Sequence, residues 1–416
     1  MDSRLLWLAL AAFVGGTEGG LVAGLLPSIS QEMGVSIGQA GLLVLAHALA
    51  YAIGTPMVAV LLGGVGRRRI LAGAEAGLAV CALLLALAPA FELMIGLRAA
   101  LAVCAGTFTG TAMATAAMLA PRGQRGRAIQ IITMGQSLAV LMGVPLGAWL
   151  ATQFSWRINY AAIAGMAAAA SLALYIKLPR GMPGDTQSMR DRIRVLGNPG
   201  VLPALGATLI FMGGGAAVMI YIAAVMTGAG ISHNFLPLVL LANGVGAVGS
   251  SMSAGRIADR LGSRRTIILA GGVVVAALLS LAALPYLPEA SRLPVLMITF
   301  GIQGYIGWGY WIAGSSQMAQ LAPSSVPVAI SLNMAAMNIG MAMAAAVGGL
   351  VVDTWDGNIL AIAGVPVVGL AMLIWMTAVP AGDATDTESA REAAEDAAVK
   401  VGATPPAPMP GPQHKP

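Results

Sequence analysis

The chain has 416 residues, of which 58% are hydrophobic and only 9% are charged. Soluble domains carry about 25% charged residues because a water-facing surface must be solvated. The composition therefore excludes a soluble globular protein. The formal net charge of +5 lies in short clusters between apolar runs, which argues against a nucleic-acid-binding face. Cys81 and Cys104 lie inside apolar runs and predict packing residues rather than disulfides.

Apolar runs long enough to cross a bilayer, about 20 residues each, recur along the whole chain. We expect spans at 5–27, 40–62, 70–90, 93–118, 128–151, 159–178, 203–225, 236–257, 266–286, 294–318, 327–350 and 358–379. The first run is too long for the apolar region of a secretory signal, so it predicts a retained span. Proline residues, including Pro27, mark the expected connections. The sequence predicts an all-α membrane protein of twelve transmembrane helices.

A polar connection at 179–200 divides the chain into two predicted six-helix bundles, residues 1–178 and 201–380. Short matches support a duplication: Arg67-Arg-Arg-Ile-Leu-Ala-Gly73 resembles Arg265-Thr-Ile-Ile-Leu-Ala-Gly271, each opening the third span of its half. Residues 381–416 begin acidic and end proline-rich, which predicts a disordered cytoplasmic tail.

Lysine and arginine residues predict the orientation. With the N-terminus in the cytoplasm, every one outside the spans and the tail falls on the cytoplasmic side, except Arg157 and Arg292. This asymmetry follows the positive-inside rule. We therefore expect a multi-pass protein of the plasma membrane, the inner membrane in bacteria, with both termini cytoplasmic.

The ionisable residues deepest within the predicted spans are Glu18 in the first, His47 in the second and Arg98 in the fourth. A charged side chain in the bilayer core costs at least about 2.5–3.5 kcal/mol, so such residues are functional candidates. At about 1.5 Å of rise per residue, Glu18 lies about 13 Å and the other two about 8–11 Å from the outer ends of their spans. We expect all three to share one layer.

Glu18 is the candidate for proton coupling, with Arg98 as its partner. A carboxyl group that moves between an arginine and apolar surroundings binds and releases a proton. The alternatives are a permanent ion pair or a neutral, hydrogen-bonded Glu18, and His47 is also explained as a packing residue. Glu75, about one turn into the third span, is expected to reach toward Arg67–Arg69 and to be structural.

Further polar and aromatic residues inside spans are candidate cavity residues, although interhelical hydrogen bonds explain most of them equally well. From these residues we select Gln136, Tyr221, Gln303 and Trp308 as candidate substrate contacts, together with His47. In the fifth span Gly143-Val-Pro145-Leu-Gly147 allows close helix approach and a bend, which suits a gating helix as well as ordinary packing.

The connection after the eighth span reads Gly255-Arg-Ile-Ala-Asp259-Arg260-Leu-Gly262-Ser-Arg264-Arg265. It resembles the loop signature of the major facilitator superfamily. Further matches resemble the drug:proton antiporter and sugar-efflux-like branches of this superfamily. They are Phe13, Gly16-Thr17-Glu18, Leu25-Leu26-Pro27, Arg98, Gly143–Gly147 and Trp156-Arg157.

The resemblance implies that Glu18 and Arg98 occupy proton-coupling and cavity positions, and that the Gly143–Gly147 motif belongs to exporters. It also implies that Asp259, Arg260 and Arg264 belong to the gating loop. The equivalent first-half loop has Gly63 in place of the aspartate, so its inner latch is expected to be weaker.

The leading hypothesis is a proton-coupled exporter of small organic molecules that works by alternating access, as a monomer. An uptake symporter of the same fold is the alternative, and a membrane sensor is a third. No H-E-x-x-H or G-x-S-x-G motif points to an enzyme, and no lysine follows a glycine, so no P-loop exists. We expect no cofactor, no metal site and no nucleic-acid partner.

Overall fold

The computed structural model describes residues 4–121, 124–184, 194–355 and 357–379, and for residues 125, 126, 259 and 324 it describes the backbone alone. The predicted tail lies outside these residues. Helices in the first half are α1 (Arg4–Met33), α2 (Ile37–Ala40), α3 (Leu42–Leu61), α4 (Arg67–Ala86), α5 (Phe91–Leu119), α6 (Arg125–Leu138), the π-helix η1 (Ala139–Gly143), α7 (Val144–Gln153) and α8 (Trp156–Lys177).

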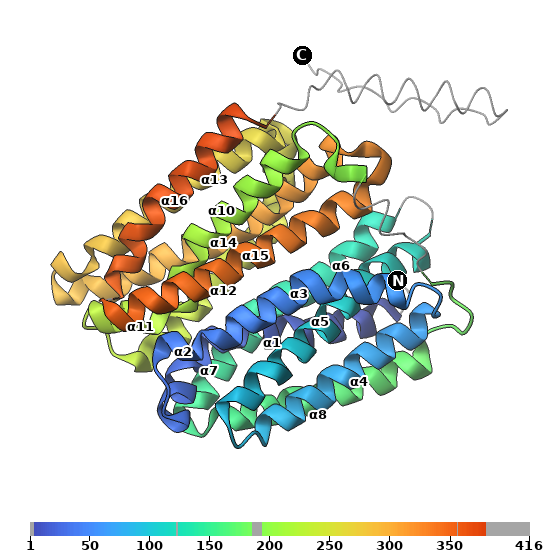
Figure 1. Cartoon of the computed structure of the whole chain (residues 1–416), viewed down its shortest axis with the longest axis horizontal. Helices are drawn as coiled ribbons and strands as arrows, with labels where there is room; N and C mark the ends of the chain where they lie inside the picture. Colours follow the sequence, from blue (N-terminus) through green and yellow to red (C-terminus); the bar gives the residue numbers. More distant parts are fainter. Residues whose placement is uncertain (1–3, 122–123, 185–193, 356, 380–416) are drawn as a thin grey trace, which may run out of the picture. The chain divides into compact units, whose positions relative to one another are not determined.

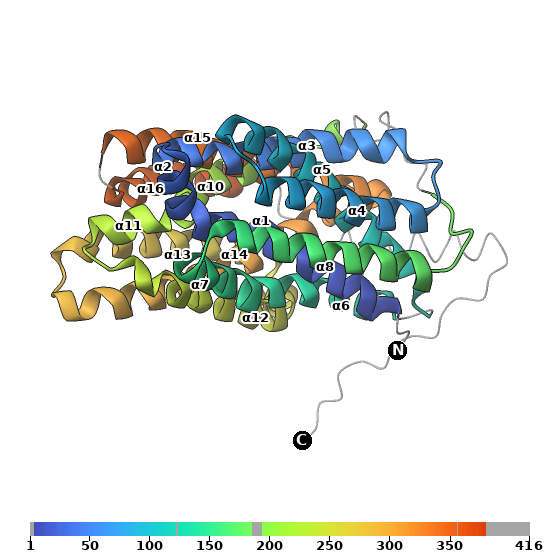
Figure 2. The ribbon, with the colours of Figure 1, turned by 90° about the horizontal axis from the view of Figure 1, so that it is seen from below.

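The second half contains α10 (Val201–Ile220), α11 (Ile222–Gly228), η2 (His233–Phe235), α12 (Leu236–Leu261), α13 (Ser263–Ala283), η3 (Leu284–Tyr286), α14 (Glu289–Leu321), η4 (Pro323–Ser325), α15 (Val326–Thr354) and α16 (Asn358–Thr377). No strand occurs among the described residues. Long helices lie side by side in both views of the molecule (Figures 1 and 2).

Within the described residues, eleven helices are long and apolar enough to cross a membrane. The predicted tenth span is the exception. Its helix, α14, has 33 residues and is therefore about 50 Å long, longer than the roughly 30 Å of a bilayer core. Glycines, tyrosines, tryptophans and Gln303 lower its hydropathy. It nevertheless packs along α12 and α13, so with α14 the described residues contain the twelve long helical crossings that the sequence predicts.

Pro27 does not end the first span, contrary to the prediction. It lies inside α1, which continues to Met33. Proline removes one backbone donor and is tolerated in membrane helices when neighbouring helices pack against the bend. Here α1 packs against the helices of the fifth and sixth crossings.

The two halves use the same helix pairing. In the first, the third helix α4 packs on α5 and α8, and the second helix α3 packs on α5. In the second, the third helix α13 packs on α14 and α16, and α12 packs on α14. This repetition supports the predicted pseudo-symmetry of two six-helix bundles. The exact boundaries of the halves stay a prediction.

Successive crossings place the connections alternately at two ends. One end, called here the arginine-rich end, holds residues 62–66, 178–184, 262 and 322–325. The arginine-poor end holds residues 34–36, 87–90, 154–155 and 229–232. The two halves meet where α3 and α2 pack on α15 and where η1 and α7 pack on α12.

Candidate functional site

A buried ion pair joins α1 to α5. Glu18 is 0% exposed and Arg98 is 1% exposed, and an Arg98 Nη1 nitrogen contacts a Glu18 carboxylate oxygen. Removing both charges from water carries a desolvation cost of several kcal/mol per ion. Packing alone does not require such a pair, so its presence at the centre of the first bundle marks a functional candidate.

His47 of α3 lies beside this pair. Its Nδ1 is 3.9 Å from Glu18 Oε2, and its ring stacks on Tyr51 with the centroids 6.3 Å apart. Side-chain exposure of His47 is 12%, so it is the most accessible of the three. The structure thus brings together Glu18, Arg98 and His47, as their depths in the sequence predicted.

Glycines hold α1 against the fifth crossing. Gly16, Gly20 and Gly24 recur every four residues on α1. A Cβ on Gly16 would lie 2.9 Å from Ala139 Cβ, and one on Gly20 would lie 2.7 Å from Val144 Cγ2. A Cβ on Gly24 would lie 3.0 Å from Ala148 Cβ. Only glycine permits this approach. This spacing is visible in the sequence as a small-residue repeat but is not among the predicted site features. It fixes the position of Glu18, which lies between Gly16 and Gly20.

The predicted glycine–proline motif forms the other side of this contact. A Cβ on Gly143 would lie 2.8 Å from Thr17 Cγ2, next to Glu18. A Cβ on Gly147 would lie 3.0 Å from Asn159 Oδ1 and would overlap the side chain of Leu21. Pro145 is buried in the first turn of α7, directly after the π-helix that ends at Gly143. Single π-turns inside α-helices are frequently found at functional sites.

Among the described residues, the bonds and ring contacts of the other selected substrate contacts involve partners other than His47. Gln303 is almost buried and its Nε2 donates to Gly215 O at 3.4 Å. Trp308 is half-buried and its ring meets Trp311 edge-on at 5.1 Å. Gln136 is half-buried on α6, and its backbone contacts Gly16.

Tyr221 lies away from these residues, at the arginine-poor end. It sits between α10 and α11, is 0% exposed, and its hydroxyl donates to Ala345 O at 2.5 Å. A Cβ on Gly41, at the start of α3, would lie 2.7 Å from Tyr221 Cζ. Tyr221 therefore takes part in the contact between the two halves.

Glu75 does not reach Arg67–Arg69, contrary to the prediction. It is 0% exposed, and neither carboxylate oxygen has a hydrogen-bond partner among the described residues. Its complete burial places the side chain inside the helix bundle. It is a second buried carboxyl group without the arginine that Glu18 has.

Arginines of the gating-loop motif have different environments. Arg264 joins α13 to α16, because its Nε donates to Trp375 O at 3.1 Å and its Nη2 to Met376 O at 2.6 Å. A cation at the carbonyl end of a helix is stabilising. Arg260 is exposed at the end of α12. The side chain of Asp259 lies outside the described residues.

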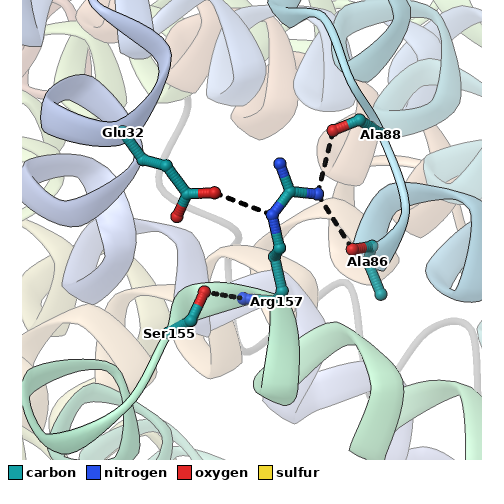
Figure 3. Close-up of polar contacts among 5 residues, drawn as sticks. All are labelled: Glu32, Ala86, Ala88, Ser155 and Arg157. Carbon is teal, nitrogen blue, oxygen red and sulfur yellow. Dashed lines mark hydrogen bonds and ion pairs between the residues drawn. The ribbon is translucent and has the colours of Figure 1, made fainter.

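The two arginines that break the charge asymmetry have a structural explanation. Arg157 Nη1 donates to Ala86 O and Ala88 O at 3.0 and 2.9 Å, and its Nε contacts Glu32 Oε1 at 2.7 Å (Figure 3). Arg292 likewise donates to Leu287 O, Ala229 O and Pro285 O. Each arginine satisfies carbonyls at the end of the third helix of its own half.

A polar contact also closes the arginine-poor end between the halves. Asp353 of α15 accepts from Ser36 Oγ at 2.6 Å and from the Gly38 backbone N–H at 3.0 Å. A Cβ on Gly38 would overlap the Gly349 carbonyl oxygen. No signal in the sequence pointed to this contact, since it joins residues about 315 positions apart.

Comparison with known proteins identifies the family of this fold. The model of the Major Facilitator Superfamily matches residues 8–288 and 204–409. The chain belongs to this superfamily. It is 30% identical to the inner membrane transport protein YdhP of Escherichia coli strain K12 over 89% of this chain and 94% of that protein. It is 29% identical to a chloramphenicol resistance protein of Streptomyces lividans over 86% of this chain and 90% of that one.

Solved transporters share the fold. The crystal structure of a mutant of the nucleoside transporter NupG aligns with a TM-score of 0.73 at 12% identity, covering 91% of this chain and all of that one. An inward-facing, occupied structure of a bacterial homologue of the human lysosomal transporter Spinster aligns with a TM-score of 0.65 at 15% identity, covering 90% of this chain and 96% of that one. This superfamily member is thus a multi-pass membrane transporter that handles small molecules.

Proposed function

We propose that this transporter exports a small organic molecule in exchange for protons, with Glu18 as the proton-carrying group. The buried Glu18–Arg98 pair beside His47 carries the proposal. An arginine beside a carboxylate favours the ionised form, and apolar surroundings favour the protonated form. A movement that separates the two side chains therefore binds a proton, and their return releases it.

The position of Glu18 couples this chemistry to helix movement. Glu18 follows Thr17, which packs on Gly143 at the end of the π-helix η1. The same crossing packs on α12 of the other half. A rocking motion between the halves thus acts on the helix that holds the carboxyl group, which suits alternating access.

The name of one relative, chloramphenicol resistance protein, favours export of an organic compound. The other relative is named an inner membrane transport protein, which supports transport without indicating its direction. We propose that the arginine-rich end faces the cytoplasm, in accordance with the positive-inside rule, and that the chain works as a monomer. His47, Gln136, Gln303 and Trp308 remain the proposed substrate contacts. The hydroxyl of Tyr221 is already bonded to Ala345 O.

Everted vesicles test the proposal, with radiolabelled chloramphenicol as the first probe and a panel of organic compounds as the second. We expect accumulation in vesicles whose lumen is acidified, loss of that accumulation in Glu18→Gln, and its retention in Glu75→Gln. Glu75 is a matched control because it is equally buried but lacks an arginine partner. Full proton-driven accumulation in Glu18→Gln contradicts the coupling role, and proton-driven entry into intact cells identifies a symporter instead.

A double variant separates folding from coupling. Removing one partner of a buried ion pair costs about 3–5 kcal/mol because the other charge is left uncompensated. We therefore expect Arg98→Gln alone to lower the yield of folded protein, and Glu18→Gln with Arg98→Gln to restore the yield but not the transport. Yield is measured by size-exclusion chromatography in detergent. Transport by the double variant at the wild-type rate contradicts the proposal.

A further inference from the structure

A pocket outside the proposed transport path lies at the arginine-rich end. It has a volume of about 530 Å³ and is lined by Gly66, Arg68, Arg69, Tyr175, Arg180, Gly181 and Met182. Ligand pockets in proteins have volumes of about 300–1,000 Å³. Three of its lining residues are arginines and none is acidic.

The wall of the pocket is held by specific contacts. Residues 180–184 fold back on the loop before α4: Arg67 Nε donates to Pro183 O at 3.0 Å. Gly181 turns the chain with a φ of +81°, which glycine adopts without strain. A Cβ on Gly66 would lie 3.1 Å from Met182 O. The pocket therefore lies between the first half and the beginning of the 179–200 connection.

The arginines present unused donors to this space. Arg68 lies over the ring of Tyr175, with Cζ 4.4 Å from the centroid, and its buried Nε has no hydrogen-bond partner among the described residues. Arg68, Arg69 and Arg180 form no ion pair with any other described residue. The first turn of α4 adds backbone N–H groups, since its N-cap Gly66 has no side chain to bond them.

We propose that this pocket binds a phosphate group. Guanidinium groups bind phosphate oxygens in a bidentate manner, and a helix N-terminus attracts anions through its free N–H groups. Leu172 and Ile176, which lie near Tyr175 on α8, are 61% and 62% exposed. These apolar side chains suit the acyl chains of a lipid, so an anionic phospholipid headgroup is the favoured source of the phosphate. The proposal does not depend on the proposed transport or coupling.

Native mass spectrometry of the full chain in detergent tests the proposal, with phosphatidylglycerol as the lipid probe. Each arginine near a membrane surface contributes about 1 kcal/mol to the attraction of an anionic lipid, which corresponds to about a fivefold change in affinity. We expect Arg68→Gln/Arg69→Gln/Arg180→Gln to weaken phosphatidylglycerol binding by at least fivefold, and phosphatidylcholine binding to the wild type to be weaker than that of phosphatidylglycerol.

A matched control removes the same charge elsewhere. Arg127, Arg194 and Arg265 are exposed and do not line the pocket. Their triple change to glutamine is expected to leave binding at the wild-type level. Equal losses in both triple variants, or none in either, overturn the proposal.

Two further arms complete the experiment. Glycerol 1-phosphate is added as a soluble competitor: displacement of the lipid identifies a soluble phosphate compound as an alternative source, and no displacement identifies the lipid as the source. Tyr175→Ala keeps the charge but removes the ring beneath Arg68, and is expected to weaken binding as well. If the triple arginine variant does not fold, the Tyr175→Ala variant serves as the test, and unchanged phosphatidylglycerol binding in that variant overturns the proposal.

Discussion

Gly41 stands where any side chain would push the two halves apart at the arginine-poor end. A Cβ on Gly41 would overlap the hydroxyl oxygen of Tyr221 and lie 2.7 Å from its Cζ. Tyr221 cannot turn aside, since it is fully buried and bonded to Ala345 O. Gly41→Ala is therefore expected to destabilise the arrangement in which this end is closed.

The size of the effect follows from the overlap. Inserting a methyl group into a packed contact costs about 1–3 kcal/mol. The cost falls only on the closed arrangement, so it shifts the equilibrium between closed and open forms by about 5- to 150-fold. Tyr221→Phe removes the overlapping oxygen, and is expected to reduce the shift when combined with Gly41→Ala.

Cysteine labelling measures this shift. Leu240 of α12 is 1% exposed, and its Cδ1 would lie 3.2 Å from a Cβ on Gly24 of α1. A cysteine at Leu240, with Cys81 and Cys104 replaced by alanine, is expected to react faster with a membrane-impermeant maleimide in cells carrying Gly41→Ala. An unchanged labelling rate refutes the reasoning.

The control is a glycine of α16 that faces open space. A Cβ on Gly369 meets no atom within 4 Å, so Gly369→Ala makes the same chemical change without a steric overlap. Its labelling rate is expected to match that of the parent. An increase as large as that of Gly41→Ala would show that added bulk in any helix loosens the protein.

Two further predictions concern stability, measured as the free energy of unfolding in detergent. Arg157→Gln is expected to cost about 1–3 kcal/mol because it removes charge-assisted bonds to two carbonyls. Glu32→Gln is expected to cost at most about 1 kcal/mol because its ion pair with Arg157 is partly exposed. Equal losses of stability in the two variants contradict the structural role of the carbonyl bonds. Gly143→Ala is expected to cost about 1–3 kcal/mol through its overlap with Thr17, and Thr17→Ala is expected to recover most of the loss. A double variant no better than Gly143→Ala rules out that contact as the cause.

Helix positions were predictable because hydropathy acts over whole spans. The predicted ranges for the second, fourth and eleventh spans, for example, differ from the observed helices by only a few residues. Pro27 was misjudged, since a proline breaks a helix in water but is tolerated where neighbouring helices pack against the bend. Hydropathy alone also underestimates α14, because its glycines and aromatic residues lower the mean hydropathy of a helix that packs against other helices.

The buried charges show what depth along a helix can and cannot predict. Glu18, His47 and Arg98 meet because the helical rise fixes depth, and three polar groups at one depth gain by contact. Depth does not fix rotation about the helix axis. Glu75 is less than two turns from Arg69, but it is fully buried and its carboxylate oxygens have no hydrogen-bond partner among the described residues. The contact of Asp353 with Ser36 was beyond prediction, since it depends on how two halves meet.

Charged side chains at the arginine-poor end form two kinds of contact: arginines bond within one half, whereas an aspartate bonds across the two halves. Arg157 and Arg292 each use their donors on carbonyls of their own half, so the proposed movement of the halves would leave these bonds intact. Asp353, by contrast, binds Ser36 and Gly38 across the halves at the protein surface. When these bonds break, water replaces the lost partners and no charge is left buried, so the cost of opening stays small. Rigid halves joined by weak, wettable contacts are what a rocking mechanism requires.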